Sequence, residues 1–306
     1  MQRIRRAGYF VTHYVRSRLG QKRPVLGGVK LTHACNLKCA HCPFWKRESP
    51  SLEFDQAVDL LKKLHEMGVR LVILEGGEPF IWKSGDRGVR ELVNETRELF
   101  FSVGITTNGT FPIEVDADIV WVSIDGLRNT HNTIRGNVFD RVMENIEKSP
   151  HPNIYAHVTI NRLNWREIPD LVDFLSGKVR GVTIQFHYPY EGVDGDDLLL
   201  PPYRRADVLD QLILMKEEGY PISDSYACLE ALKNNSWQCH PWMIASVEAD
   251  GTLTHGCYLK GRADISCDRC GFAAHTEISL AYSGVLESIW LGNKIFNKRR
   301  RKITNA

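Results

Sequence analysis

The sequence predicts an α/β protein in which six parallel strands, covered by helices, wrap into a barrel or open barrel, with a cysteine-rich extension behind it. The first observation is that short apolar segments alternate along the chain with segments of helical periodicity, a pattern that favours a parallel sheet. The second is that a long cysteine-free stretch separates Cys42 from Cys228. The third is that 306 residues, 43% hydrophobic and 25% charged, are an ordinary globular composition.

Composition and charge exclude several classes of protein. The formal net charge of +2 gives no reason to expect a nucleic-acid partner. No apolar run approaches the ~20 residues of a membrane span, and no signal-peptide pattern follows the basic start. Eight cysteines in two groups do not resemble the disulfide framework of a small secreted protein, so we expect metal sites in a reducing cytoplasm.

Residues 1–24 form the first predicted unit, a basic amphipathic helix that ends at Pro24. Such a helix can make peripheral contact with an anionic membrane, or it can pack as a solvated helix across the bottom of the barrel. Both interpretations stay open, so the predicted location is cytoplasmic with or without membrane association. The basic residues are Arg3, Arg5, Arg6, Arg16, Arg18, Lys22 and Arg23, and the apolar ones between them are Ile4, Tyr9, Phe10, Tyr14, Val15 and Leu19.

Residues 25–190 form the predicted barrel and residues 191–306 the predicted C-terminal extension. Functional groups in such folds lie at the C-terminal ends of the strands, so those ends are where a site is expected. The predicted strands span 25–32, 70–74, 103–107, 119–124, 153–160 and 182–188, and the predicted helices span 54–67, 89–101, 139–148 and 165–175.

The first strand leads directly into the loop LTHACNLKCAHCPFW, which holds Cys35, Cys39 and Cys42 in the pattern C-x3-C-x2-C. Three thiolates this close surround a single point. A zinc site needs a fourth ligand, for which His33 and His41 are the nearest candidates. On an iron–sulfur cubane, three cysteine sulfurs leave one iron without a protein ligand, and a small molecule can bind and react there.

The second strand ends in Gly76, Gly77, Glu78 and Pro79. Two glycines remove side chains from the backbone, so we expect a ligand to approach it closely. A strand-end carbonyl or the Glu78 carboxylate can accept hydrogen bonds from an ammonium group.

Together, the C-x3-C-x2-C loop and the GGEP turn resemble the radical S-adenosylmethionine (SAM) superfamily. The resemblance implies a (β/α)6 partial TIM barrel and a [4Fe–4S] cluster held by Cys35, Cys39 and Cys42, whose fourth iron is chelated by the amino and carboxylate groups of SAM. It also implies that the GGEP turn holds the SAM amino group. The residue before the third cysteine is often aromatic in this family and packs near the adenine; here it is His41, whose flat ring can also stack.

Further SAM contacts are expected at the ends of the third, fourth and fifth strands. Ser123 and Asp125 alternate onto one face, where a carboxylate suits ribose hydroxyls. The stretch from Asp125 to Phe139 resembles the SPASM branch of the superfamily, and its Arg135 is the candidate partner of the SAM carboxylate, because a guanidinium matches a carboxylate bidentately. The additional candidate cofactor-binding residues are Thr107, Asn108, Ser123, Asp125, Arg135 and Asn161.

The second cysteine group lies around a predicted hairpin with an Asp250-Gly251 turn. Four thiolates that meet fit either a closed [4Fe–4S] cluster or zinc. The arrangement resembles SPASM/twitch extensions, which implies one auxiliary [4Fe–4S] cluster. Cys228 is left over and is expected to be a small buried residue. The four predicted ligands are Cys239, Cys257, Cys267 and Cys270.

The functional hypothesis is a radical SAM enzyme that reductively cleaves SAM to a 5′-deoxyadenosyl radical and uses it on an unactivated carbon or an alkene. It implies an electron donor such as ferredoxin or flavodoxin. The overall layout is most similar to adenosylhopane synthase-like radical SAM proteins, which with the basic first helix favours an isoprenoid or membrane lipid as substrate.

Two alternatives remain open. The first is a radical SAM maturase of a peptide, protein or cofactor precursor. The second is of another class, a non-catalytic protein that binds zinc at both cysteine groups and contains no iron.

Overall fold

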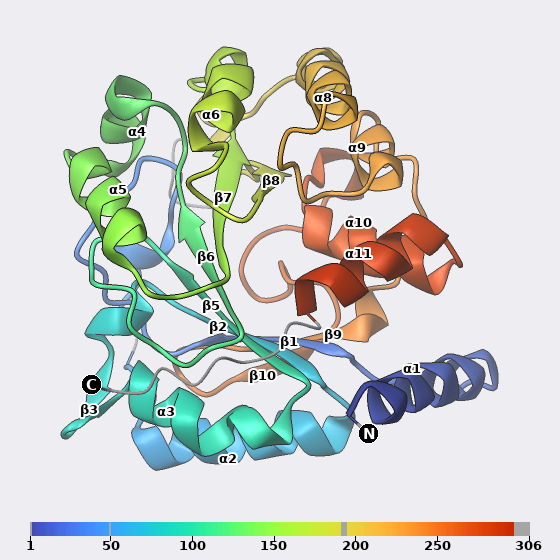
Figure 1. Cartoon of the computed structure of the whole chain (residues 1–306). Coiled ribbons are helices and arrows are strands. Elements are labelled where there is room, and N and C mark those ends of the chain that lie inside the picture. Colours follow the sequence, from blue (N-terminus) through green and yellow to red (C-terminus); the bar gives the residue numbers. More distant parts are fainter. Residues whose placement is uncertain (1, 49, 191–194, 297–306) are drawn as a thin grey trace.

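The computed structural model describes residues 2–48, 50–190 and 195–296, and its main feature is one eight-stranded sheet (Figure 1). Neighbouring strands are parallel except for the pair at one edge, where β10 (Leu253–His255) runs antiparallel to β9 (Ile244–Val247). The α/β partial-barrel prediction is therefore confirmed. From β9 inward, the remaining strands are β1 (Leu26–Lys30), β2 (Leu71–Glu75), β5 (Ser102–Thr107), β6 (Ile119–Ser123), β7 (Ile154–Ile160) and β8 (Val182–Phe186).

The six predicted barrel strands all form, each within two residues of its predicted limits. Successive side chains of each strand point to opposite faces of the sheet, one toward the outer helices and one toward the barrel interior. In β6, Val120 and Val122 join the large core beneath the outer helices. Trp121, on the opposite face, packs with Tyr155 of β7 inside the barrel.

Helices cover the outer face of the sheet (Figure 1). In α2 (Phe54–Met67), Ala57, Leu61 and Leu64 are fully buried, and Gly68 ends the helix with φ 119°, which glycine adopts without strain. The predicted helix over 89–101 is shorter, because its last turn is a 3-10 helix, Arg97–Leu99. The other outer helices are α3 (Val89–Thr96), α4 (Arg128–Arg135), α5 (Phe139–Lys148), α6 (Ile168–Leu175) and α8 (Pro202–Glu217), and a short β3–β4 hairpin (Lys83–Ser84, Arg87–Gly88) precedes α3.

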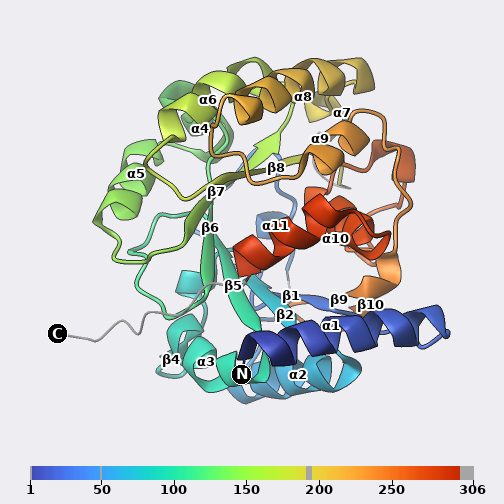
Figure 2. The same ribbon diagram turned by 45° about the vertical axis from the view of Figure 1, so that its right-hand side comes forward.

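The C-terminal part of the chain continues the barrel sheet, because β9 pairs in parallel with β1. The Asp-Gly hairpin between β9 and β10 forms as predicted. Figure 2 shows α10 (Ala273–Tyr282) and α11 (Leu286–Phe296) between α9 (Tyr226–Leu232) and the first helix. Leu291 and Ile295 of α11 pack with Trp121 and Tyr155, so α11 closes one end of the barrel interior. A short helix, α7 (Gly195–Leu198), precedes α8.

The first helix, α1 (Gln2–Arg18), packs against the barrel through one side only. The Tyr9 hydroxyl donates to the Gly68 carbonyl, and a His13 ring nitrogen lies 2.9 Å from the Arg23 carbonyl oxygen. Among the described residues, no helix is both long enough and apolar enough to cross a membrane.

Candidate functional site

The cysteine loop follows β1 at the C-terminal edge of the sheet, and Cys35, Cys39 and Cys42 are all free thiols. The loop is tied to α4, because the Ala40 N–H donates to the Ile134 carbonyl at 2.8 Å. Burial raises the pKa of Cys39 to about 12, with Arg135 lowering it and the neighbouring Cys42 and Cys35 adding to the rise. The thiolates of this loop would therefore repel one another, and a bound metal centre would relieve that repulsion.

Gly76 and Gly77 hold the cysteine loop by direct backbone contact. The Gly77 N–H donates to the Thr32 carbonyl at 2.7 Å. A Cβ atom would lie 2.6 Å from the Thr32 oxygen if built on Gly76, and 2.0 Å from the Ala34 oxygen if built on Gly77. The expectation that these glycines leave room for a ligand needs correction: the chain approaching their Cα positions is the cysteine loop itself.

Glu78 is fully buried and its carboxylate joins two strand ends. Oε1 accepts from the Phe80 N–H at 3.0 Å and from the Thr107 hydroxyl at 2.8 Å, and Oε2 accepts from the Asn108 N–H at 2.7 Å. Glu78 therefore braces the turn and is not an open acceptor for a ligand ammonium. Asn108 reaches the cysteine loop, with its Nδ2 3.7 Å from Cys35 Sγ.

Arg135 lies beside the cysteine loop at the C-terminal end of α4. Its Nη1 is 3.9 Å from Cys39 Sγ, and its Nε donates to Asp125 Oδ2 at 2.5 Å. Burial raises the pKa of Asp125, but Arg135 and His41 outweigh it and hold the pKa below its usual value. The other Asp125 oxygen accepts from the Thr159 N–H at 2.8 Å. Asp125 thus orients Arg135, and its carboxylate does not stand free for a ribose as the sequence suggested.

The remaining predicted SAM-site residues differ in whether their side chains are free to contact a ligand. His41 lies 3.8 Å from Asp125 and packs edge-on against His187; burial lowers its pKa to about 3, so its ring is neutral and suited to stacking. Asn161 uses its side chain within its own turn, where Oδ1 accepts from the Leu163 N–H at 2.9 Å. Ser123 is buried at the end of β6, and Pro79 is buried in the 3-10 turn Pro79–Ile81.

The four cysteines of the second group interact electrostatically. Burial, together with Cys270, Cys257 and Cys267, raises the pKa of Cys239 to about 11. Arg205 of α8 supports the group, because Nη1 donates to the Cys270 carbonyl at 2.6 Å.

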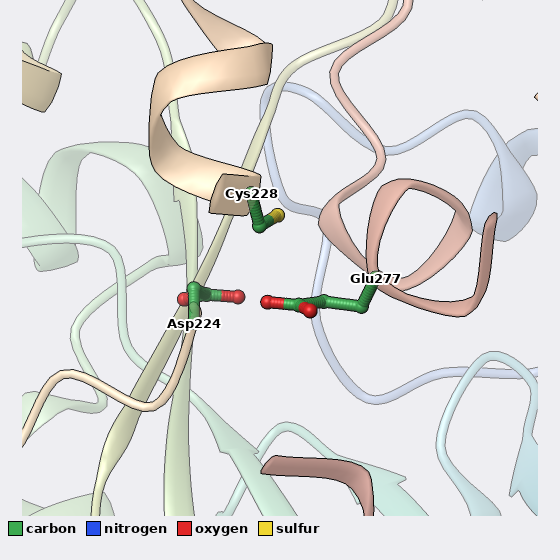
Figure 3. A group of neighbouring side chains, drawn as sticks. All are labelled: Asp224, Cys228 and Glu277. Atoms are coloured by element: carbon green, nitrogen blue, oxygen red, sulfur yellow. The ribbon is translucent and has the colours of Figure 1, made fainter. Parts of the chain in front are cut away.

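Cys228 stands apart from both groups, as predicted, and is fully buried. Figure 3 shows the Asp224 and Glu277 carboxylates turned toward each other beside its sulfur, with one ligand atom of each residue within 4.8 Å of the others. Glu277 accepts from the Ser225 N–H at 2.6 Å and from its hydroxyl at 3.0 Å. Burial raises the pKa of Asp224 to about 8, and Glu277 adds to the effect, so Asp224 holds a proton at neutral pH.

A family model for the radical SAM superfamily matches residues 29–175, which include the cysteine loop, the GGEP turn and Arg135. The chain carries a radical SAM domain. Its relatives include Fe-coproporphyrin III synthase of Methanosarcina barkeri, 29% identical over 65% of this chain and 54% of that protein. The sporulation killing factor maturation protein SkfB of Bacillus subtilis is 32% identical over 52% of this chain and 42% of that protein.

Similarity at lower identity extends beyond the radical SAM domain. The mycofactocin maturase MftC of Mycolicibacterium smegmatis is 25% identical over 92% of this chain and 74% of that protein. Streptococcus suis SuiB, solved with bound S-adenosylmethionine, superposes with a TM-score of 0.64 at 14% identity, over 90% of this chain and 67% of that one. SuiB shares the fold, while this chain spans about half the length of Fe-coproporphyrin III synthase and SkfB.

The ligand spacing of an iron–sulfur cubane differs from that of a single zinc ion. Sulfurs around a single tetrahedral zinc lie about 3.8 Å apart, whereas cubane ligands bind different irons and stand farther apart. In the described part of the chain, the group of three with ligand atoms within 4.8 Å of one another is the one at Cys228, and neither predicted cysteine group forms such a set. Cys35, Cys39 and Cys42 are the residues that would hold the [4Fe–4S] cluster that the radical SAM family implies.

One set of residues in the barrel mouth was not predicted. Lys30, Glu75, Glu248, Tyr258 and Arg262 form a buried ionic network next to the cysteine loop. Lys30 and Glu75 each end a strand, so the rule that functional groups lie at the C-terminal ends of strands could have predicted them. The partners from the extension could not be found that way, because the pairing of β9 with β1 is not visible in the sequence.

Proposed function

We propose that this protein is a radical SAM enzyme, in which Cys35, Cys39 and Cys42 hold a [4Fe–4S] cluster that binds SAM at its open iron. When bound, the cluster supplies the electron that cleaves SAM to methionine and a 5′-deoxyadenosyl radical. The observation that carries the proposal is the joining of cysteine loop, GGEP turn and Arg135 in one buried constellation.

The chain's own residues would bind and orient SAM. Asp125 fixes the Nε of Arg135, while Nη1 lies beside the cysteine loop, where the guanidinium would bind a carboxylate. His41 offers a neutral, flat ring for the adenine. Gly77 and Glu78 keep the loop and the neighbouring strand ends in register, so they act as positioning residues.

We propose a peptide, protein or cofactor precursor as the substrate. Relatives named as maturases of a killing factor and of mycofactocin support it. So does the barrel interior, where polar side chains follow β7 and β8: His157 Nδ1 lies 3.0 Å from the Thr183 hydroxyl, and the Gln185 amide donates to Thr159 at 3.2 Å. These side chains make this part of the interior wall polar, which suits a polar substrate better than a hydrocarbon.

The experiment is to incubate the reconstituted, reduced protein with SAM labelled in the adenosine moiety and extracts of its source cells. The extract is fractionated before the assay into peptides and proteins, polar small molecules, and organic-soluble lipids. The proposal predicts 5′-deoxyadenosine formation stimulated by one of the first two fractions. Stimulation confined to the lipid fraction, or label appearing in a lipid adduct, would replace this substrate class with the lipid one.

A second proposal concerns the cysteines of the extension. Cys239, Cys257, Cys267 and Cys270 would hold an auxiliary [4Fe–4S] cluster, and a small donor such as ferredoxin or flavodoxin would supply electrons. Iron and zinc analysis tests it: about eight irons per chain support two clusters. Iron in the first site with zinc in the second would remove the auxiliary cluster only.

A lipid substrate stays a second candidate because of α1. Ile4, Val11 and Val15 recur along its solvent-facing side and, like Leu19 just after the helix, are more than half exposed, among basic residues that suit anionic headgroups. Flotation with vesicles containing phosphatidylglycerol tests this. Salt-sensitive binding that Val11→Asp and Leu19→Asp abolish supports membrane contact, and no flotation at low salt removes it.

A further inference from the structure

Three neighbouring strands of the barrel end in charged residues that face its interior. Lys30 ends β1, Glu75 ends β2, and Glu248 directly follows β9. The strands are parallel, and Lys30 is in register with Glu75. Lys30 Nζ lies 3.2 Å from Glu75 Oε1 and donates to the Tyr258 hydroxyl oxygen at 2.8 Å. Because C-terminal strand ends share one edge of the sheet, this group lies at the same level as the cysteine loop.

Arg262 adds a second cation from the segment between Cys257 and Cys267. Its Nε donates to Glu248, and its guanidinium stacks 3.8 Å from the centre of the Tyr258 ring. Its side chain is fully buried. Two cations and two carboxylates thus balance in charge, and the stacking fixes the plane in which the guanidinium can bind a further partner.

The protein does not supply acceptors for the whole guanidinium. Within the described residues, neither Nη1 nor Nη2 of Arg262 makes a hydrogen bond. Nη1 stands 3.8 Å from Glu75 Oε1, which is an ion-pair distance but too long for a hydrogen bond. Buried donors are almost always satisfied in folded proteins, so two free donors on one planar edge indicate a missing acceptor.

His33, which lies beside the other carboxylate oxygen of Glu248, also lacks hydrogen-bond partners. Its Nε2 lies 3.5 Å from Glu248 Oε2, yet neither ring nitrogen makes a hydrogen bond, and the residue is buried. His33 also lines a surface pocket together with Trp45 and Arg47. Arg47 donates to the Arg262 carbonyl at 2.7 Å, so the pocket wall is joined directly to the Arg262 segment.

We propose that Arg262 is the receptor for a carboxylate of the substrate, reached through the pocket beside His33. A carboxylate has two acceptor oxygens at the spacing of the two Nη groups, and an arginine fork binds it bidentately. The inference rests on the proposed function, because it assigns the substrate class of that site. It selects a carboxylate-bearing substrate, such as an acidic peptide or an organic acid, over a neutral hydrocarbon.

The SAM carboxylate is a competing occupant, and the charge balance with Glu75 and Glu248 is a purely structural alternative. Binding measurements distinguish these two alternatives from the proposal.

The reconstituted protein, saturated with SAM under anaerobic conditions, is titrated calorimetrically with glutarate, and with glutaramide as the neutral counterpart. The test variant is Arg262→Met combined with Glu248→Gln, so that no carboxylate is left unpaired. Arg262→Lys is the second variant, which keeps the charge and loses the fork.

The control is Arg70→Met, at the opposite end of β2, where Nη1 donates to the carbonyls of His65 and Val69. The proposal predicts that glutarate binds the wild type and the control, that glutaramide does not, and that both Arg262 variants lose at least about tenfold in glutarate affinity with SAM affinity unchanged. Equal glutarate binding by the variants overturns it. An equal loss of SAM affinity also overturns it, because the occupant is then SAM.

The proposed function is tested apart from this inference. SAM cleavage by the wild type is measured in the same preparation without glutarate. A wild type that binds glutarate through Arg262 but never cleaves SAM contradicts the proposed function, and one that cleaves SAM without Arg262-dependent binding contradicts the inference.

Discussion

The backbone of Gly77 lies so close to Ala34 that a Cβ atom on Gly77 would stand 2.0 Å from the Ala34 carbonyl oxygen. The next residue extends the contact, since the Glu78 N–H donates to that oxygen at 2.9 Å. The turn after β2 is thus the surface against which the cysteine loop is held. A loop that must present three thiols to one cluster depends on such a support.

We predict that Gly77→Ala displaces the cysteine loop and lowers the iron bound at the first site. A clash with backbone cannot be relieved by a rotamer change, so the loop must move. The measurement is iron content and SAM binding after identical reconstitution. The control is Gly8→Ala in α1, where a Cβ meets nothing within 4 Å; it should be neutral or stabilise by about 0.5–1 kcal/mol. Full iron content and SAM affinity in Gly77→Ala would contradict the support role.

Arg135→Lys should weaken SAM binding about tenfold, because lysine cannot form the paired hydrogen bonds of a guanidinium. Asp125→Asn should act in the same direction by releasing the Nε anchor. Equilibrium dialysis with labelled SAM measures both. Arg128→Lys is the matched control, since Arg128 lies on the same helix and pairs with the exposed Asp140. SAM affinity equal to wild type in Arg135→Lys would rule out the assigned contact.

The Asp224–Glu277 pair predicts a pH-dependent stability. The folded-state pKa of Asp224 is about 8, while an unfolded aspartate titrates near 4. The unfolded chain therefore loses this proton first, and stability falls as pH rises from about 4 to about 8, by at most about 1.4 kcal/mol per pH unit. Asp224→Asn should flatten this slope and raise the melting temperature at pH 8. Unfolding curves between pH 5.5 and 8 measure it, and an unchanged slope would show that the pair does not share a proton.

Substitution of the extension cysteines should separate the two clusters. Cys257→Ala should remove about half of the iron and leave SAM affinity near that of the wild type, because the first cysteine loop is intact. Cys228→Ala is the control, since Cys228 lies outside both groups, and it should retain full iron content. Iron analysis with electron paramagnetic resonance of the reduced protein reports each site. Full iron in Cys257→Ala would exclude Cys257 as a ligand.

Local patterns were enough to predict the barrel. Each strand is a short apolar run next to a helical pattern, and motifs on adjacent residues, such as the three cysteines, are visible without a fold. The helix α4 was missed because RNTHNTIR is rich in Asn and Thr, which have low helix propensity. Tertiary contact compensates: Ile134 at its end accepts the Ala40 N–H.

The exact role of each site residue could not be predicted, because roles depend on which groups already have partners. Glu78 and Asp125 both look like free acceptors in the sequence. In the structure, Glu78 accepts hydrogen bonds from Thr107 and Asn108, and Asp125 accepts one from Arg135. Arg262 is the reverse case, since nothing local distinguishes it from a surface arginine until β9 pairs with β1.

The measurement that tests the central claim most directly is anaerobic SAM cleavage by the reconstituted, dithionite-reduced protein, with Cys39→Ser as the paired variant. The account predicts equal amounts of 5′-deoxyadenosine and methionine from the wild type, and none from Cys39→Ser. A colourless wild-type protein that binds zinc, takes up no iron and leaves SAM intact would contradict it.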